Sequence, residues 1–424
     1  MPAPTFDRLS PPEKGTAIRV EAKGLRVSDD PVIPYIRGDG IGPEVVAAAR
    51  QVLDAAVNQT YGGARRLVWW RIPAGMEAEE AYGELLPADV LTAIRHYLVA
   101  LKGPLTTPIG GGFRSLNVSL RQQLDLYANV RPIAWIPEVP SPLKHPERVD
   151  LVVFREATED VYAGIEWAAG SEDARKLLGI LEESYGLRVD NDPALGLKPV
   201  SEFASKRLVR KALAYAVERG RRSVTLMHKG NIMKHTEGAF MRWGYEVATQ
   251  EFGDQVVTEE EAWDRHGGTT PEGKVLVKDR LADNMLQQLL TRTAEYDVIA
   301  TTNLNGDYVS DAAAGLVGGL GVAPGGNVGD EMALFEPIHG SAPKYAGRDV
   351  ANPTAEILAG AMLLDYLGWP EAAEAVRAGV KGAIQAREVT QDLARQIEGA
   401  QTVGTQEFSR RVIGAMAEPG ASPP

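Results

Sequence analysis

Cationic side chains gather in one short stretch, between residues 114 and 132. The segment RSLNVSLRQQLDLYANVRP carries Arg121 and Arg131, together with Ser115 and Asn117. The planar guanidinium of arginine can bind a carboxylate through two parallel hydrogen bonds, and serine and asparagine add further polar groups. The stretch therefore favours a site for a substrate with several carboxylates. An exposed helix with ordinary surface arginines is the competing interpretation.

Two carboxylates follow in the segment NLNGDYVSDAAA, at Asp307 and Asp311. A spacing of four residues puts both on one face of a helix, where like charges repel. A cation between them would relieve this repulsion, and hard oxygen ligands select Mg²⁺ or Mn²⁺. Asp283, in KDRLADNM, could supply a third oxygen ligand. Alternatively, Asp307 caps the helix and Asp311 is exposed.

Proton-transfer groups are the third feature. Lys229 follows the strand-like segment SVTLMH and precedes Gly230. A partly desolvated lysine at a strand end can act as an acid–base group, although a structural ion pair would explain it too. Arg155, in FREATEDVYAG, is a further candidate cation beside Tyr162.

The segment EPIHGSAPKYAGRDVANP, residues 336–353, predicts a loop with special backbone demands, because it contains Gly340 and a second glycine beside prolines. Lys344 and Tyr345 give this loop a cation and an aromatic face that could hold a phosphorylated nucleotide. The chain has neither a P-loop nor a convincing G-x-G-x-x-G motif. GDGIG at 38–42 has the wrong spacing, and a tight strand-to-helix turn explains it as well.

Composition narrows the class of protein. The 424 residues are 44% hydrophobic and carry a formal net charge of −12, with no cysteine. Disulfides and cysteine nucleophiles are therefore excluded, and a nucleic-acid partner is not expected, because no basic stripe stands out against this charge. No apolar run is long enough to span a membrane, and the N-terminal segment does not resemble a signal peptide. We expect a cytoplasmic protein.

Strand-like and helical patterns alternate along the chain, which favours α/β architecture. The segment 163–200 has few periodic signals and could be an excursion from the main core. The expected helices lie at 43–57, 205–218, 236–252, 284–292 and 355–369. The expected strands lie at 31–37, 67–70, 97–103, 150–156, 223–230, 274–279 and 296–303.

Taken together, these segments resemble the prokaryotic NADP-dependent isocitrate dehydrogenases. That group belongs to the β-decarboxylating dehydrogenase family, with the isopropylmalate and homoisocitrate dehydrogenases. The resemblance covers about residues 31–410 and rests on ordered blocks: LKGPLTTP, GGGFRSLN, NVRP, FREATEDVYAGIE, HKGNIMK, NLNGDYVSDA and HGSAPKYAG. It implies NADP-dependent oxidative decarboxylation of isocitrate to 2-oxoglutarate and CO₂, a reaction of the tricarboxylic acid cycle.

The resemblance also implies an isocitrate/isopropylmalate dehydrogenase-like fold, which is not a classical Rossmann fold. Its large domain would comprise 1–126 and 318–424, and its small domain 127–159 and 203–317. A clasp, 160–202, would interlock the two subunits of a homodimer with shared active sites.

Site roles carry over by position in the matching motifs. Tyr162 and Lys229 would be the acid–base pair, with Lys229 donated by the second subunit. Isocitrate would be held by Ser115, Asn117, Arg121, Arg131, Arg155 and Lys102. The metal ion, Mg²⁺ or Mn²⁺, would be bound by Asp307 and Asp311 and by Asp283 of the second subunit.

The resemblance assigns NADP through a larger set. Lys344 and Tyr345 stand where NAD-users of the family place an acid and an aliphatic residue, and a 2′-phosphate needs cationic partners. Gln391 departs from the tyrosine of many NADP-users, and Arg292 would come from the second subunit. The expected cofactor-binding residues are Thr107, Gln287, Gln288, Arg292, Glu336, His339, Gly340, Ala342, Lys344, Tyr345, Asn352, Gln391 and Arg395.

Two other functions remain open at this point. Isopropylmalate or homoisocitrate would be alternative substrates, but the polar pair Ser115 and Asn117 suits a carboxylate better than an isopropyl group. A non-catalytic regulatory paralogue would have lost acid–base or metal residues, and none is missing. Ser115 also stands at a position that some bacterial members phosphorylate, where a phosphate would repel the substrate.

Overall fold

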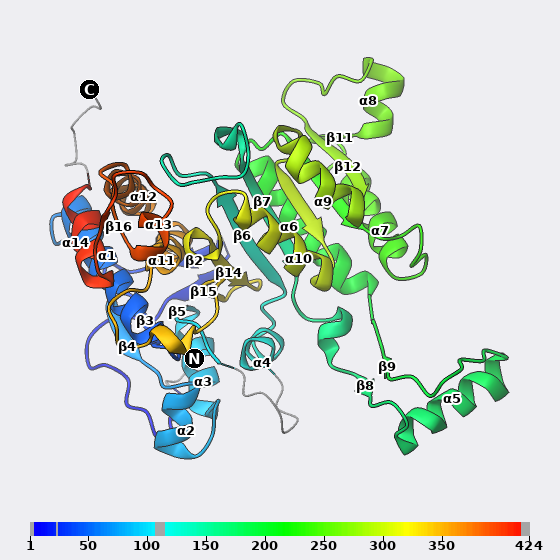
Figure 1. Cartoon of the computed structure of the whole chain (residues 1–424), viewed down its shortest axis with the longest axis horizontal. Helices are drawn as coiled ribbons and strands as arrows, with labels where there is room; N and C mark the ends of the chain where they lie inside the picture. The colour runs from blue at the N-terminus through cyan, green and yellow to red at the C-terminus, as the bar shows by residue number, and fades with distance from the viewer. Residues whose placement is uncertain (1–3, 23, 107–114, 417–424) are drawn as a thin grey trace.

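One mixed sheet of eleven strands runs through the whole molecule (Figure 1). The computed structural model describes residues 4–22, 24–106 and 115–416. The sheet order is β11 (Val256–Thr258), β12 (Val275–Leu281), β10 (Ser223–His228), β13 (Val298–Thr301), β7 (Asp150–Glu156), β6 (Ala128–Ala134), β14 (Pro324–Val328), β15 (Ala333–Pro337), β5 (Val99–Lys102), β3 (Val32–Ile36) and β4 (Val68–Arg71).

The two ends of this sheet are parallel and its centre is antiparallel. β7 pairs antiparallel with β6, β6 with β14, and β14 with β15. All the other neighbouring strands of this sheet pair parallel. The seven strands expected from apolar runs are all present. The expected limits of the large and small domains, which stay a prediction, would divide the sheet between β6 and β14.

Helices cover the sheet on both halves of the molecule (Figure 1). α1, α11, α12 and α14 pack together at the end near β5, while α6, α7, α9 and α10 surround the strands β7, β13, β10 and β12. The α-helices are α1 (Gly42–Tyr61), α2 (Met76–Tyr82), α3 (Ala88–Tyr97), α4 (Leu116–Gln123), α5 (Glu172–Tyr185), α6 (Glu202–Glu218), α7 (Glu237–Glu251), α8 (Glu259–His266), α9 (Ala282–Thr291), α10 (Asn303–Gly315), α11 (Thr354–Tyr366), α12 (Pro370–Gln385), α13 (Gln391–Ala394) and α14 (Thr405–Gly414).

The helix α6 illustrates why these segments fold as they do. Ser201 caps its first turn, since the hydroxyl accepts a hydrogen bond from the amide of Ala204 at 3.1 Å. Leu208, Ala212 and Leu213 then recur at helical spacing and are fully buried against the sheet. Within the described residues, no helix has the length and apolar character needed to cross a membrane.

The expected excursion leaves the body of the molecule as an arm (Figure 1). Its two-residue strands β8 (Glu166–Trp167) and β9 (Leu195–Gly196) pair antiparallel, and α5 lies between them. Ala174 is the only residue of α5 that is buried in the single chain. Large apolar side chains such as Tyr185 and Leu187 are exposed on this arm. Its role as an intersubunit clasp stays a prediction.

The GDGIG turn supports the loop that follows β15. Gly40 has a φ of 59°, and a Cβ there would lie 2.0 Å from the carbonyl oxygen of Ser341. The amide of Ile41 donates a hydrogen bond to the same oxygen at 2.9 Å. This glycine therefore permits a close approach between two backbone segments, which explains the motif without a dinucleotide fingerprint.

Candidate active site

A cavity of about 220 Å³ opens where β6, β7, α4 and α10 meet the segment after β15. Residues far apart in the sequence line it together. Seven of them were expected at the site from the sequence: Ser115, Asn117, Arg121, Arg131, Arg155, Tyr162 and Asp307. Glu336, His339 and Gly340, expected near the cofactor, also line this cavity.

Strand register brings the arginines together. Asn129 and Arg131 lie two residues apart on β6, so their side chains share one face of the sheet. Arg155 of β7 lies directly opposite Asn129 in the antiparallel pair. The Nε of Arg131 donates to the side-chain oxygen of Asn129 at 2.7 Å, which fixes the orientation of the guanidinium.

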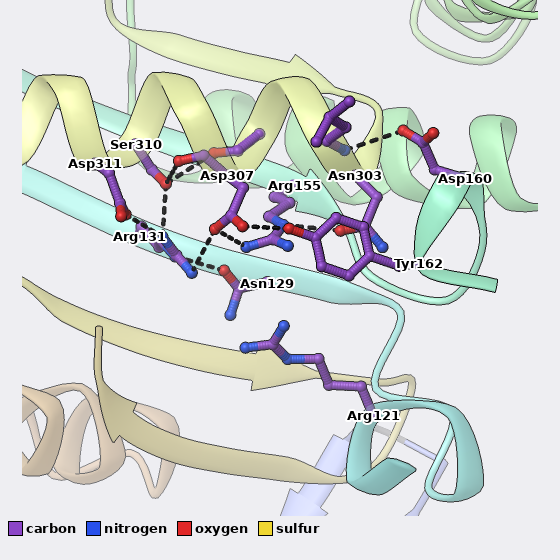
Figure 2. A network of polar contacts seen from close by, with 12 residues as sticks. Arg121, Asn129, Arg131, Arg155, Asp160, Tyr162, Asn303, Asp307, Ser310 and Asp311 are labelled. Carbon is purple, nitrogen blue, oxygen red and sulfur yellow. Dashed lines mark hydrogen bonds and ion pairs between the residues drawn. The ribbon is translucent and has the colours of Figure 1, made fainter. Parts of the chain in front are cut away.

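One face of α10 supplies the opposing carboxylates (Figure 2). Asn303, Asp307, Ser310 and Asp311 recur at helical spacing and point toward β6 and β7. Arg131 donates to the hydroxyl of Ser310 at 2.7 Å and to the carboxylate of Asp311 at 2.8 Å. The expected pair of acids on one helical face is therefore present.

Asp307 contacts both a cationic side chain, Arg155, and the expected acid–base residue, Tyr162. Its carboxylate accepts hydrogen bonds from the guanidinium of Arg155 and from the hydroxyl of Tyr162. Burial acts to raise the pKa of Asp307, but the charge of Arg155 and the bond from Tyr162 outweigh it, and the pKa falls below its usual value. Burial also raises the pKa of Tyr162 to about 12, with Asp307 adding to the effect.

The three arginines give the cavity an unusual electrostatic character. Burial, followed by repulsion from Arg131 and Arg121, lowers the pKa of Arg155 to about 10. Burial likewise lowers the pKa of Arg131. The side-chain oxygen of Asn117 is buried and has no hydrogen-bond partner among the described residues. Buried polar groups are normally satisfied, so a charged and hydrogen-bonding ligand fits this cavity.

An ion-pair cluster lies beneath the arginines. The Nζ of Lys102 contacts the carboxylate of Glu336 at 2.6 Å, and Arg121 donates to the same carboxylate at 3.1 Å. Burial acts to raise the pKa of Glu336, but the two cations lower it well below its usual value. Lys102 itself is only 1% exposed and does not line the cavity, so its charge acts through Glu336.

A second cavity of about 290 Å³ adjoins the first, because His339 and Gly340 line both. Its wall consists mainly of the loop that follows β15 and of α13 with its C-terminal end, together with Ile41 and Gly321. Most of the residues expected to bind NADP lie here: His339, Gly340, Ala342, Tyr345, Asn352, Gln391 and Arg395.

The second cavity has groups suited to a nucleotide. The Nε2 of His339 is buried without a hydrogen-bond partner in the described part of the chain. Asn352 bonds Asp392 at 2.9 Å and thereby joins the two walls. Lys344 lies beside this cavity, with its Nζ 4.9 Å from the centre of the Tyr345 ring. A flat aromatic surface with cations around it fits a phosphorylated nucleotide.

Other expected residues lie elsewhere in the single chain. Lys229, directly after β10, contacts Asp283 of α9 through its Nζ at 2.5 Å, and neither residue lines a cavity described above. Gln287, Gln288 and Arg292 also belong to α9 or its C-terminal end. Within the described residues of one chain, no three metal-binding side chains converge. Thr107 lies outside the described residues.

Several polar residues of the site are not among those expected from the sequence. Asn129 lines the first cavity, while Ser310 and Asn303 hold the arginines from α10. The signal for Asn129 was its spacing, since it precedes Arg131 by two residues in the NVRP block. Asn327 of β14, which accepts from Arg121 at 2.7 Å, had no comparable signal.

The ion pairs of Glu336 predict a pH-dependent contribution to stability. Its pKa is depressed from an ordinary 4.5, so the stabilisation is complete above pH 4.5 and is lost as the pH falls toward the folded-state pKa. Glu336→Gln should lower the free energy of unfolding at pH 7 by about 3–5 kcal/mol, since two buried cations lose their partner. The difference from wild type should shrink below pH 4.5.

The matched control is Glu138→Gln, which breaks an exposed pair with Arg387 and should cost about 1 kcal/mol or less. Chemical denaturation at several pH values measures both variants. Equal costs for Glu336 and Glu138, or a Glu336 cost that is constant with pH, would contradict the assigned ion pairs.

Comparison with known proteins places this geometry in a family. The family model described as isocitrate/isopropylmalate dehydrogenase matches residues 32–412. The "Isocitrate dehydrogenase [NADP]" of Archaeoglobus fulgidus is 58% identical over 96% of this chain and 98% of that protein. The protein of the same name in Pseudomonas aeruginosa is 50% identical over 97% of this chain and 100% of that protein.

A solved structure agrees with the sequence relatives. The crystal structure of isocitrate dehydrogenase from Methylococcus capsulatus is 38% identical, with a TM-score of 0.75 over 91% of this chain and 99% of that chain. The expected α/β fold, distinct from a classical Rossmann fold, is thereby confirmed. The chain belongs to the isocitrate/isopropylmalate dehydrogenase family.

Proposed function

We propose that the protein catalyses NADP-dependent oxidative decarboxylation of isocitrate to 2-oxoglutarate and CO₂. The observation that carries this proposal is the convergence of three buried arginines with the carboxylates of α10 in one cavity. Isocitrate has three carboxylates and a secondary alcohol, so a cavity with three guanidinium groups suits its charge. The names of the relatives support the same substrate and cofactor.

Ser115 and Asn117 favour isocitrate over isopropylmalate. Both line the cavity from the start of α4. An isopropyl group would leave these polar atoms unsatisfied and desolvated, which costs free energy. A carboxylate in the same place would accept hydrogen bonds from the serine hydroxyl and the asparagine amide.

A divalent metal ion fits the acidic face of α10. Asp307 lines the cavity and Asp311 lies one turn further along α10, and we infer that Asp283 of a second subunit completes the set. Oxygen ligands of this kind suit Mg²⁺ or Mn²⁺. The bound ion would polarise the alcohol and carboxylate of the substrate, and NADP would accept the hydride.

The chain's own residues supply binding and proton transfer. Arg121, Arg131 and Arg155 orient the substrate carboxylates. Lys229 of the second subunit takes part in removing the proton of the alcohol, after which the oxidised β-keto acid loses CO₂. Tyr162 returns a proton to the carbon that carried the lost carboxylate, and its hydroxyl is a donor toward Asp307.

A homodimer follows from this assignment. Lys229 and Asp283 bind each other at 2.5 Å in one chain and lie outside both cavities, so a complete site requires them from a second copy. The arm from β8 to β9 carries exposed apolar residues that a second subunit could cover. The two subunits would then share two composite active sites.

The substrate assignment predicts strong selectivity between two related hydroxy acids. With NADP and Mg²⁺, isocitrate should be oxidised with kcat/KM at least about 10⁴-fold above isopropylmalate, because the polar pair rejects an apolar substituent. NADPH absorbance at steady state measures both rates. Comparable rates with the two acids, or activity with isopropylmalate alone, would refute the assignment, and no activity with either would favour a regulatory paralogue.

The cofactor assignment predicts a change of preference. Lys344→Asp with Tyr345→Ile should lower kcat/KM for NADP by about 100-fold or more, because charge-assisted bonds to the 2′-phosphate are lost. The value for NAD should fall much less, so the ratio shifts toward NAD. Lys381→Asp, on the exposed side of α12, is the control and should change neither. An unchanged kcat/KM for NADP would refute the assignment.

Shared active sites predict complementation between inactive chains. Tyr162→Phe and Lys229→Met should each be inactive as homodimers. Refolding them together places both substitutions in one site of each heterodimer and leaves the other site intact. Random pairing should restore about one quarter of wild-type activity, since half the dimers carry one working site of two. A mixture as inactive as its parents would show that the residues serve the same chain.

A further inference from the structure

A partly buried lysine between two carboxylates joins the segments that carry the catalytic groups. Lys198 lies between β9 and α6, and its Nζ contacts Asp160 at 2.5 Å and Glu237 at 2.9 Å. Both carboxylates are only 1% exposed, and the lysine side chain is 17% exposed. We call these three residues the Lys198 cluster. Neither the family's substrate set nor its metal set, as assigned above, includes any of them.

Asp160 fixes the segment of Tyr162 to the start of α10. Asp160 has a φ of 70° and begins the short 3₁₀ helix η2 (Asp160–Ala163). Its carboxylate accepts from the amide of Val161 at 2.7 Å and from that of Leu304 at 3.0 Å. The position of Tyr162 relative to Asp307 on α10 therefore depends on this carboxylate.

Glu237 holds the turn that contains Lys229 against helix α10. At the first turn of α7, its carboxylate accepts from the backbone amide of Lys229 and from the side chain of Asn305 at 2.9 Å. It also accepts from the hydroxyl of Thr302 at 3.1 Å. Burial acts to raise the pKa of Glu237, but Lys198 outweighs it and the pKa is lowered, so the group is charged.

Lys198 is the cation that allows these two carboxylates to be buried side by side. Without it, two like charges would face each other in a desolvated place, and repulsion would move the segments that they hold. Displacement of a reacting group by about 1 Å can cost about 100-fold in rate. Arg121 and Arg131 lie on α4 and β6 and make no contact with the cluster among their assigned bonds.

We propose that Asp160, Lys198 and Glu237 are positioning residues that set Tyr162 and Lys229 from one buried cluster. This inference rests on the proposed function, in which Tyr162 serves the active site of its own chain and Lys229 serves that of the second subunit. One cluster therefore controls groups in both active sites of the dimer. A defect in one chain must then impair two sites.

The first experiment separates positioning from binding. Lys198→Met should lower kcat by about 100-fold while the KM for isocitrate stays within about threefold, because the arginine set is intact. Lys198→Arg keeps a cation between the carboxylates and should restore most of kcat. Lys206→Met is the matched control, since Lys206 also bridges two carboxylates, Glu202 and Glu246, but on the surface of α6 and α7. Its kcat should equal wild type.

The second experiment uses heterodimers isolated with two different affinity tags. A heterodimer of wild type with Tyr162→Phe should keep about half of wild-type activity, because one site is intact. A heterodimer of wild type with Lys198→Met should keep less than about 10%, because one chain's cluster positions groups in both sites. Half or full activity in the Lys198→Met heterodimer would overturn the proposal.

A folding control keeps the outcome decisive. If Lys198→Met is not recovered as a folded dimer, Lys198→Gln replaces it, since its amide can still hydrogen-bond to the two carboxylates but carries no charge. The same heterodimer result is expected. Failure of the proposed function would be seen separately, as no isocitrate turnover by wild type or no complementation between Tyr162→Phe and Lys229→Met. Retained complementation with a half-active Lys198→Met or Lys198→Gln heterodimer would refute only the positioning cluster.

Discussion

The burial of Arg131 and Arg155 against the carboxylates of α10 is the interaction on which the site depends. Guanidinium groups are costly to remove from water unless charge and hydrogen bonds compensate. Asp307 and Asp311 provide the charge, and Asn129, Ser310 and other neutral groups provide the remaining acceptors. The arginines are thereby held ready for an anion.

This arrangement requires the antiparallel centre of the sheet. β6 and β7 place Asn129 opposite Arg155, and α10 crosses above them with its polar face toward the strands. β14 and β15 then carry Asn327 and Glu336 to the other side of the arginines. A fully parallel sheet would gather such groups at one edge only. The mixed sheet instead brings these groups together at its middle. There, β15 also leads into the loop that lines the second cavity.

Many of the strands and site residues could be predicted from the sequence, but other strands and the contacts between the site residues could not. Buried parallel strands such as β10 and β13 are largely apolar runs, so their positions were evident. The strand β14, PGGNV, has proline and glycines that hide it, and β6 was not recognised because Arg131 and Pro132 interrupt its apolar pattern. Arg131 and Asp311 could be identified individually, whereas their direct bond depends on strand register and helix crossing, which local spacing does not contain. The Lys198 cluster joins residues up to 77 positions apart by tertiary contact, and no motif marks it.

Product stoichiometry tests the central claim most directly. One reaction mixture of the protein with isocitrate, NADP and Mg²⁺ should be analysed for NADPH, released CO₂ and 2-oxoglutarate. The account predicts that the three products form in equal amounts from isocitrate, because oxidation and decarboxylation occur in one site. Absence of NADPH, or NADPH formed without an equal amount of CO₂ and 2-oxoglutarate, would contradict it.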